Sequence, residues 1–283
     1  MVVALGAALF PQATPGLLEG GHEFYTNAGA FAAREVLETF AGGNVVIGVA
    51  SAPYKCVPAP SETAMLVHDL LKERGLLDRS TVTLLLPLPR PVPPAPDASA
   101  AILAAFAERG IAFRPDSPVA SLDPERKVVV VGDGEEIPYD LFLGVPVHAA
   151  PAVLQDAGMC VDGYVPVDPL TMETQFPGVY AVGDVAATGT PKAGVFSEGQ
   201  AIVAAQRIIA TLRGEEPSAE YDGRGTCYVE FGHDEVARID IRFAAGEPPT
   251  GSLVGPSPEV TQDKAEFGRS RVKRWFGRDW TGV

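Results

Sequence analysis

The stretch VVIGVASAPYKCVPAPSE, from Val45 to Glu62, indicates a strand that turns directly into a helix. Its apolar beginning is typical of a strand that is buried on both faces of a parallel sheet. Pro60 and Ser61 can begin the helix. At such a junction a dinucleotide-binding domain normally carries glycines that receive a phosphate. This turn instead holds Cys56 among prolines, and the missing G-x-G-x-x-G argues against NAD(P) binding here.

The sequence around this junction continues the alternation of strands and helices. Between residues 42 and 138, buried-type strands alternate with helical segments in the order β-α-β-α-β, and Asp-Pro and Asp-Gly turns then indicate a small antiparallel meander. This order predicts a nucleotide-binding-type α/β domain. Two more apolar strands, a helix that ends at Gly214, a strand pair and a basic helix complete the chain. In the helix after the junction, the residues predicted to share one apolar face are Met65, Leu66, Leu70 and Leu71.

Composition limits the kinds of protein that this chain can be. Its 283 residues allow two domains, and its formal net charge of −14 opposes binding to nucleic acid or to an anionic membrane, although a local basic patch could bind either. The three cysteines are too few and too widely spaced for a disulfide scaffold or a zinc module, so no metal site is predicted. The apolar opening has no basic flank, which favours a strand over a signal peptide. We expect a cytoplasmic or peripherally membrane-bound protein.

The most specific segment is TQFPGVYAVGDVA, from Thr174 to Ala186. It fits T-x5-YAxGD, the second flavin-binding signature of flavoproteins with two dinucleotide-binding domains. The strand ends at Gly183, whose missing side chain lets the backbone approach a ligand. Asp184 can accept hydrogen bonds from ribityl hydroxyls, and Val185 after it leads to the next helix, whose N-terminus can face the cofactor. The alternative is an ordinary strand and loop with an exposed aspartate.

The opening VVALGA supports the flavin interpretation, because it resembles a strand that ends in a flavin-contacting glycine in the same proteins, here Gly6. With both segments in place, the chain resembles FAD-dependent pyridine nucleotide-disulfide oxidoreductases. Within them it is similar to the sulfide:quinone oxidoreductases and the flavoprotein of flavocytochrome c sulfide dehydrogenase. The segments that carry the resemblance are LGA with TPGL, PYKCVPAPSE, VPVHAAP, VYAVGD, PKAGVFSEGQA and TCYVEFG.

The resemblance implies an α/β fold with two dinucleotide-binding domains, bound FAD and a C-terminal α+β segment. Relatives begin with a β-α-β unit that carries G-x-G-x-x-G, which this chain lacks. We therefore expect an N-terminally truncated form of the fold, with an uncovered sheet edge and an exposed apolar face. The implied parts are a remnant of the FAD-binding domain (1–41), an NAD(P)-binding-like middle domain (42–138), a second FAD-binding segment (139–215) and a C-terminal redox-cysteine or interface segment (216–283).

The resemblance also assigns roles to three residues. In this group the first βα turn of the middle domain projects a redox cysteine at the flavin, and Cys56 occupies that turn. Its position at a helix N-terminus beside Lys55 predicts a favoured, nucleophilic thiolate, whereas a small buried hydrophobe is the alternative. Cys227 matches the second redox cysteine, opposite the first across the flavin, with a structural cysteine as the alternative. Lys192 matches a lysine that stabilises reduced flavin, with a solvated surface lysine as the alternative.

Two other residues and the last helix carry weaker signals. Cys160 matches nothing in the group. His148 follows a buried strand and is either a proton carrier or a turn or core histidine. Residues 264–280 combine basic and aromatic side chains, which would suit a peripheral membrane contact, a homo-oligomer contact or packing against an acidic part of the protein.

Together these features imply an FAD-dependent oxidoreductase. A sulfur substrate would be captured at Cys56, and a persulfide or a Cys56–Cys227 disulfide would form. Two electrons would then pass to FAD and on to a quinone or cytochrome acceptor. The alternative is a catalytically inactive fragment or interaction module without FAD, which the missing phosphate loop favours. An NADH dehydrogenase is disfavoured because the middle domain lacks the glycine fingerprint.

Overall fold

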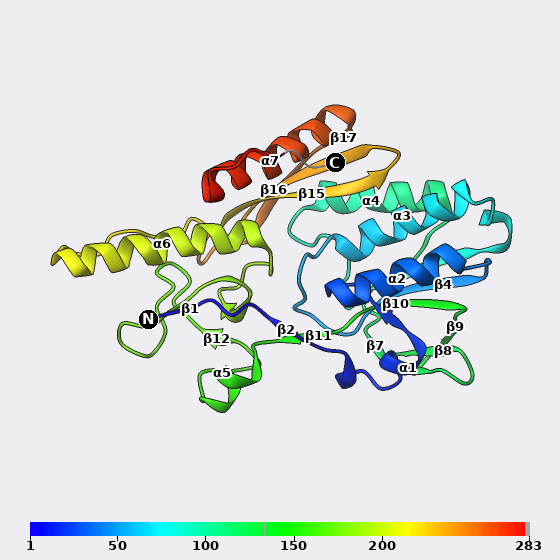
Figure 1. Cartoon of the computed structure of the whole chain (residues 1–283), viewed down its shortest axis with the longest axis horizontal. Helices are drawn as coiled ribbons and strands as arrows, with labels where there is room; N and C mark the ends of the chain where they lie inside the picture. Colours follow the sequence, from blue (N-terminus) through cyan, green and yellow to red (C-terminus); the bar gives the residue numbers. More distant parts are fainter. Residues whose placement is uncertain (133, 281–283) are drawn as a thin grey trace.

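A five-stranded parallel sheet forms the centre of the α/β part of the molecule. The computed structural model describes residues 1–132 and 134–280. Strand β4 (Asn44–Val49) lies in the middle of the sheet, whose order is β3-β10-β4-β5-β6 (Figure 1). Ile47 of β4 lies opposite Leu143 of β10 and Leu84 of β5. The other strands are β3 (His22–Glu23), β5 (Thr81–Leu85), β6 (Ala112–Arg114) and β10 (Leu141–Val145).

Alternate residues of β4 point into two different cores. Val45 and Ile47 pack in a core that also holds side chains of α2, α3 and α4, whereas Val46 packs with Leu85 and Phe142 against the meander. This is the period of two that a strand imposes on its side chains. Helices thus cover one face of the sheet and an antiparallel meander covers the other. The helices are α2 (Asn27–Thr39), α3 (Ala59–Glu73) and α4 (Pro96–Arg109), and the meander is β7 (Val119–Asp123), β8 (Val128–Val131) and β9 (Glu136–Pro138), with the short α1 (Leu17–Gly20) beside it.

Helix α3 buries a face that only partly agrees with the sequence prediction. Met65 and Leu71 are buried as expected, but Leu66 is 43 % exposed and Leu70 is half-buried. The buried stripe also contains Ala64, which is fully buried. Because a helix turns by about 100° per residue, a stripe centred near Ala64 and Met65 leaves Leu66 at its edge. There Leu66 and Leu70 line a groove between α2 and α3.

The five-stranded sheet draws on more of the chain than the predicted middle domain. Two of its strands, β3 and β10, lie outside residues 42–138. The division of the chain into four parts remains a prediction.

Short ladders connect the beginning of the chain to later segments. β1 (Val2–Val3) pairs in parallel with β13 (Tyr180–Ala181), and β2 (Ala8–Phe10) pairs antiparallel with β11 (Val147–Ala149). The strand predicted to reach Gly6 is therefore shorter, because the chain leaves the ladder after β1 and Gly6 adopts φ +67°. The remaining elements of this part are α5 (Ala152–Asp156), β12 (Val165–Pro166), η3 (Gly183–Val185), β14 (Ala186–Ala187) and α6 (Gly194–Arg213).

A three-stranded antiparallel sheet packs on the outer side of α3 and α4 (Figure 1). Its strands β15 (Arg224–Gly232) and β16 (Glu235–Arg242) are the predicted strand pair. The third strand, β17 (Thr250–Ser257), was not predicted, since its sequence TGSLVGPS has no regular apolar alternation. Helix α7 (Pro258–Phe276) packs on β16 and begins earlier than predicted, with the Ser257 side chain capping the helix.

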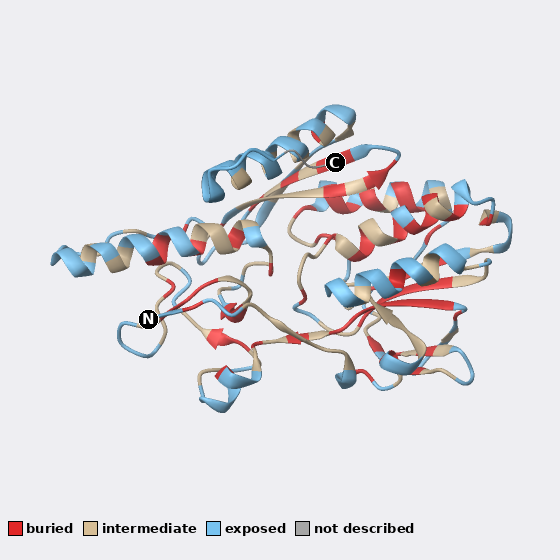
Figure 2. Ribbon diagram, in the orientation of Figure 1, coloured by how far each residue is buried: buried red, intermediate tan, exposed pale blue. Residues whose placement is uncertain are grey.

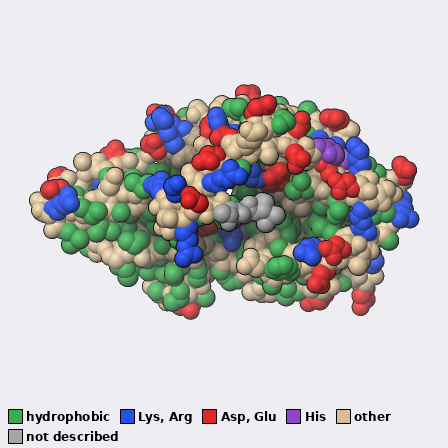
Figure 3. Space-filling model, turned by 45° about the horizontal axis from the view of Figure 1, so that its top comes forward, with side chains coloured by type: hydrophobic (Ala, Val, Ile, Leu, Met, Phe, Trp, Pro, Cys, Tyr) green, Lys and Arg blue, Asp and Glu red, His purple; other side chains and the backbone are tan. Residues whose placement is uncertain are grey.

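Apolar side chains are exposed on α6 and near the first residue. Ile209 and Leu212 of α6 are 47 % and 82 % exposed, and Leu5 is 56 % exposed. Figure 2 shows the long exposed end of α6, and Figure 3 shows hydrophobic side chains that gather at the same end of the molecule.

Candidate functional site

The turn between β4 and α3 holds Cys56 in an unusual backbone conformation. Its φ is +55°, in the left-handed region that few non-glycine residues adopt. The backbone N–H of Cys56 donates a hydrogen bond to the carbonyl oxygen of Lys192 at 2.9 Å, and Lys55 forms a parallel bridge with Lys192. The cysteine turn is thus fixed against the segment that follows the YAVGD strand.

Cys56 and Cys227 line the same cavity, which has a volume of about 230 Å³. We call it the thiol cavity. Both cysteines are free thiols and partly buried. Cys227 lies on β15, opposite Ile239 of β16, and Ile239 also lines the cavity. The fold therefore brings together two cysteines that are far apart in the sequence.

Both thiols are held in the protonated form. Burial, and to a lesser extent the carboxylate of Glu62, raise the pKa of Cys56 to about 12. Burial also raises the pKa of Cys227 to about 11. The sequence-based expectation of a favoured thiolate at Cys56 is therefore wrong for this structure. Burial outweighs the helix N-terminus, and Lys55 directs its Nζ at the carbonyl oxygen of Ala7, 3.5 Å away.

A second cavity, of about 580 Å³, lies beside α6 and is lined by Gly6, Gly183 and Asp184. A Cβ on Gly6 would meet no atom within 4 Å, so the backbone there is open to a ligand. Gly183 has φ +80°, and a Cβ on it would lie 3.3 Å from Oγ of Ser197. The two glycines from the predicted flavin segments thus face one cavity, and Gly183 is required by its backbone conformation.

Asp184 is partly buried, and Lys192 is buried. Oδ1 of Asp184 is buried and has no hydrogen-bond partner among the described residues. Burial raises the pKa of this carboxyl, while Lys55 and Lys192 lower it. The Lys192 residue is only 6 % exposed, and burial lowers its pKa to about 8. Neither an exposed aspartate nor a solvated surface lysine describes these residues.

The position of Lys192 is set by two contacts of its ammonium group. Nζ donates to the carbonyl oxygen of Ala186 at 2.7 Å and lies 3.9 Å from the centre of the Tyr164 ring. Val185, which the sequence also assigned to the cofactor, is fully buried in a core with Val3. Only the backbone of Val185 can therefore face a ligand.

These features fit the flavin end of FAD. A carboxylate oxygen that has no partner among the described residues is available for a ribityl hydroxyl, and Gly6 leaves the backbone open in the same cavity. Asp184, Gly6 and Gly183 would hold the group.

Gln200 of α6 is a site residue that the sequence analysis did not identify. Its side chain is buried, and Oε1 accepts a hydrogen bond from the backbone N–H of Gly183 at 2.8 Å. Nε2 donates to the hydroxyls of Thr188 and Thr190 at 3.3 and 3.2 Å. Gln200 thus fixes the loop on both sides of Asp184. Its place in the predicted helix gave no signal, because glutamine side chains are mostly exposed in proteins.

Comparison with known proteins identifies the family. Residues 1–207 match the family model described as pyridine nucleotide-disulphide oxidoreductase. The chain belongs to this family. It resembles the sulfide:quinone oxidoreductases within it, as the sequence motifs indicated.

Curated relatives are longer than this member of the family. The sulfide-quinone reductase of Aquifex aeolicus is 25 % identical over 222 residues, which cover 71 % of this chain and 51 % of the relative. The dihydrolipoyl dehydrogenase of Chlamydia trachomatis is 27 % identical over 192 residues, which cover 66 % of this chain and 38 % of the relative. The chain thus spans about half or less of the length of these relatives.

Solved structures share the fold of this oxidoreductase family member. The sulfide:quinone oxidoreductase of Aquifex aeolicus superposes with a TM-score of 0.75 at 19 % identity. The superposed part covers 97 % of this chain and 72 % of the chain of that enzyme. A ferredoxin reductase from Rhodopseudomonas palustris gives 0.61 at 19 % identity, over 87 % of this chain and 58 % of its own. The fold is therefore that of two-domain FAD- and NAD(P)-binding oxidoreductases.

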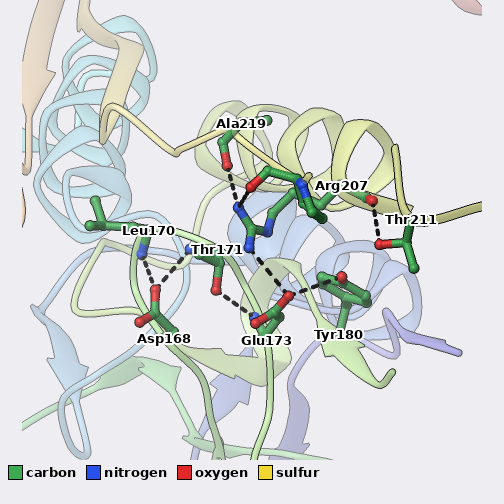
Figure 4. A network of polar contacts seen from close by, with 9 residues as sticks. Asp168, Leu170, Thr171, Glu173, Tyr180, Arg207, Thr211 and Ala219 are labelled. Carbon is green, nitrogen blue, oxygen red and sulfur yellow. Dashed lines mark hydrogen bonds and ion pairs between the residues drawn. The ribbon is translucent and has the colours of Figure 1, made fainter. Parts of the chain in front are cut away.

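Arg207 joins three segments around strand β13 (Figure 4). Its Nη1 donates to the carbonyl oxygens of Pro217 and Ala219, both at 3.1 Å, and Nη2 donates to Oε1 of Glu173 at 3.4 Å. The same glutamate oxygen accepts a hydrogen bond from the hydroxyl of Tyr180 at 3.1 Å. Because Tyr180 lies on β13, Arg207 supports the strand that leads into the second cavity.

Replacing this arginine is expected to destabilise the fold. In Arg207→Met the carbonyl oxygens of Pro217 and Ala219 lose their donor, so the free energy of unfolding should fall by about 2 to 3 kcal/mol in a urea titration. The matched control is Arg213→Met at the exposed end of the same helix, which should change the value by less than about 0.5 kcal/mol. Equal stability of the two variants would contradict the supporting role of Arg207.

His148 is a core histidine in this structure. The residue is buried, and Nδ1 lies 2.8 Å from the carbonyl oxygen of Pro146, so Nδ1 carries the hydrogen. Burial lowers the pKa of His148 to about 4. A neutral ring at pH 7 favours the core alternative over the proton carrier.

Cys160 and helix α7 also have defined positions. Cys160 packs beside a small core near Leu154 and lines neither cavity. On α7, Nε of Arg271 and Nη1 of Arg274 bind the carboxylate of Glu198 at 3.2 and 2.7 Å. These two arginines therefore pack against an acidic residue of α6. Among the helices of residues 1–132 and 134–280, none combines the length and apolar character that a membrane crossing needs.

Proposed function

We propose that this protein is an FAD-dependent oxidoreductase that passes two electrons from a sulfur donor, through Cys56 and Cys227, to a quinone or cytochrome acceptor. The observation that carries the proposal is that one short segment of the chain lines both cavities. Lys192 and Ala193 line the thiol cavity, and the next residue, Gly194, lines the cavity of Gly183 and Asp184.

The cysteines would act as the entry point for electrons. Sulfide attacks a Cys56–Cys227 disulfide at the sulfur of Cys56, so that Cys56 becomes a persulfide and Cys227 leaves as a thiolate. Transfer of the outer sulfur to a second sulfide releases the Cys56 thiol. Reoxidation of the two thiols to the disulfide gives up two electrons and two protons. A bound FAD would supply the two-electron acceptor for this step.

Other side chains of the chain would control charge around the cofactor. Lys192 and Lys55 place two cations near Asp184, which favours extra negative charge in this part of the molecule. Asp184 would orient the ribityl chain through its unpartnered oxygen. Gln200 would keep the backbone of Gly183 in position. The same proposal includes a small-molecule sulfur donor and a quinone or cytochrome acceptor. It also includes a homo-oligomer and a peripheral membrane contact through residues 264–280.

The proposal is tested by the visible spectrum of the purified chain and by its response to sulfide. Flavin bands near one per protein are expected, either as purified or after addition of FAD and gel filtration. Anaerobic sulfide should bleach these bands, whereas NADH should leave them unchanged. A protein that retains no flavin under either condition would instead support a catalytically inactive interaction module.

A further inference from the structure

The left-handed backbone of Cys56 depends on support from a distant part of the chain. A residue with a side chain keeps a φ of +55° only where the surrounding structure imposes it. Two hydrogen bonds hold the Cys56 backbone. Its carbonyl oxygen accepts from the N–H of Ala59 at 2.9 Å, within the start of α3, and its N–H donates to the carbonyl oxygen of Lys192 at 2.9 Å. Of these two bonds, only the one with Lys192 comes from outside the turn and its helix.

The carbonyl group of Lys192 belongs to a loop, residues 188–192, that is folded on itself. The hydroxyls of Thr188 and Thr190 lie 2.8 Å apart, and the N–H of Thr190 donates to Oγ1 of Thr188 at 3.4 Å. Most of this loop also lines the thiol cavity, through Gly189, Thr190, Pro191 and Lys192. The position of the loop therefore sets both the shape of the cavity wall and the acceptor for the Cys56 N–H.

The amide of Gln200 connects this loop to the strand end at Gly183. Its Nε2 donates to the hydroxyls of Thr188 and Thr190, and its Oε1 accepts from the N–H of Gly183. The residue is 2 % exposed, so water does not compete for these bonds. The residues that line the two cavities do not include Gln200. Gln200 can therefore act on a cavity only through the groups that it holds.

We infer that Gln200 is a positioning residue for Cys56: it holds residues 188–192 where the Lys192 carbonyl keeps the cysteine turn left-handed and the thiol in the wall of the thiol cavity. The use of this thiol as the point of sulfur capture rests on the proposed function. Without the amide, the loop loses its link to Gly183, and the Cys56 backbone can relax to a conformation that residues with a side chain prefer. The thiol then meets water.

Replacement of the amide tests this role through the reactivity of Cys56. Gln200→Met keeps a long side chain in the buried position and removes both the donor and the acceptor. Alkylation of Cys56 by iodoacetamide at pH 7.5 should become at least about tenfold faster, because hydration favours the reactive thiolate. Cys160 in the same samples should react at the normal rate. The matched control is Gln155→Met, which removes an amide that donates to the carbonyl oxygen of Ala150 at 2.7 Å and should leave Cys56 unchanged.

The pH profile of alkylation separates positioning from a general loss of stability. Burial is the main cause of the raised pKa of Cys56, so a hydrated thiol should titrate nearer the ordinary cysteine value of about 8.5. The rate in Gln200→Met should therefore approach a plateau below pH 10, whereas the unmodified protein should show a steady rise. If Gln200→Met is folded by circular dichroism and keeps the normal rate and profile at Cys56, the inference is wrong.

A pair of variants at Thr190 tests the same link without a change in the helix. Thr190→Val removes the hydroxyl and retains the shape of the side chain, so Cys56 alkylation should accelerate by about threefold or more. Thr190→Ser retains the hydroxyl and should restore the normal rate. Equal rates in the two variants would overturn the inference. Alkylation needs neither flavin nor sulfide, so its outcome is independent of the test of sulfide-dependent flavin reduction.

Discussion

Cys56→Ser is expected to slow sulfide-dependent reduction of the bound flavin by about a thousandfold or more. A serine hydroxyl cannot form the persulfide or the disulfide through which electrons would enter. Flavin binding should persist, because Cys56 lines the thiol cavity and not the cavity of Gly183 and Asp184. The measurement is anaerobic stopped-flow absorbance of the flavin bands after mixing with sulfide.

Two further cysteine variants make this result specific. Cys227→Ser should cause a loss of similar size, since the disulfide needs both sulfurs. Cys160→Ser should reduce flavin at the normal rate, because Cys160 lines neither cavity. If Cys56→Ser kept the normal rate while it retained flavin, sulfur capture would have to occur elsewhere in the protein.

The predictable parts of the fold are those whose sequences contain a clear apolar run or a clear helix-ending signal. Strand β4 is a continuous apolar run, and α6 ends at Gly214 in the left-handed conformation that the glycine indicates. The sequence of strand β17 shows no such pattern. The strand forms by pairing with β16, which the sequence of β17 alone does not indicate. The prediction that Leu66 lies on the buried face was wrong, because the four leucine and methionine positions are compatible with more than one buried face of the helix.

The candidate site was predictable only in part. The motifs indicated Gly183, Asp184 and Cys56, because a missing side chain, a carboxylate and a thiol at strand ends have direct chemical meaning. Nothing in sequence spacing could place Cys227 beside Cys56, since that proximity arises when β15 packs against α3. Gln200 escaped notice because its partners lie in a loop that only the folded chain brings to it.

The protonation of Cys56 illustrates why local sequence was insufficient. Lys55 and a helix start are visible in the sequence and predict a low thiol pKa. Burial is a tertiary property, and it carries the larger effect here, together with the carboxylate of Glu62. The two interpretations place the pKa of the Cys56 thiol several pH units apart, which makes the difference easy to measure.

Alkylation of Cys56 by iodoacetamide is expected to accelerate about tenfold for each pH unit between pH 7 and 10. Only the thiolate reacts, and with a pKa of about 12 the thiolate fraction rises in proportion to hydroxide over this whole range, about a thousandfold in total. Peptide mass spectrometry at each pH would give the rate, with far-ultraviolet circular dichroism to verify that the chain stays folded. A plateau at pH 7 to 8 would instead establish the low pKa that the sequence suggested.

A variant of the neighbouring carboxylate identifies the cause of the shift. Because the ionised Glu62 raises the pKa of Cys56, Glu62→Gln should lower that pKa and speed alkylation at alkaline pH by several-fold. Glu73→Gln, at the exposed end of the same helix, should leave the rate unchanged. The pH dependence should remain steep in Glu62→Gln, since burial is the larger cause and the substitution retains it. A rate in Glu62→Gln equal to that of the unmodified protein would show that Glu62 does not contribute to the raised pKa.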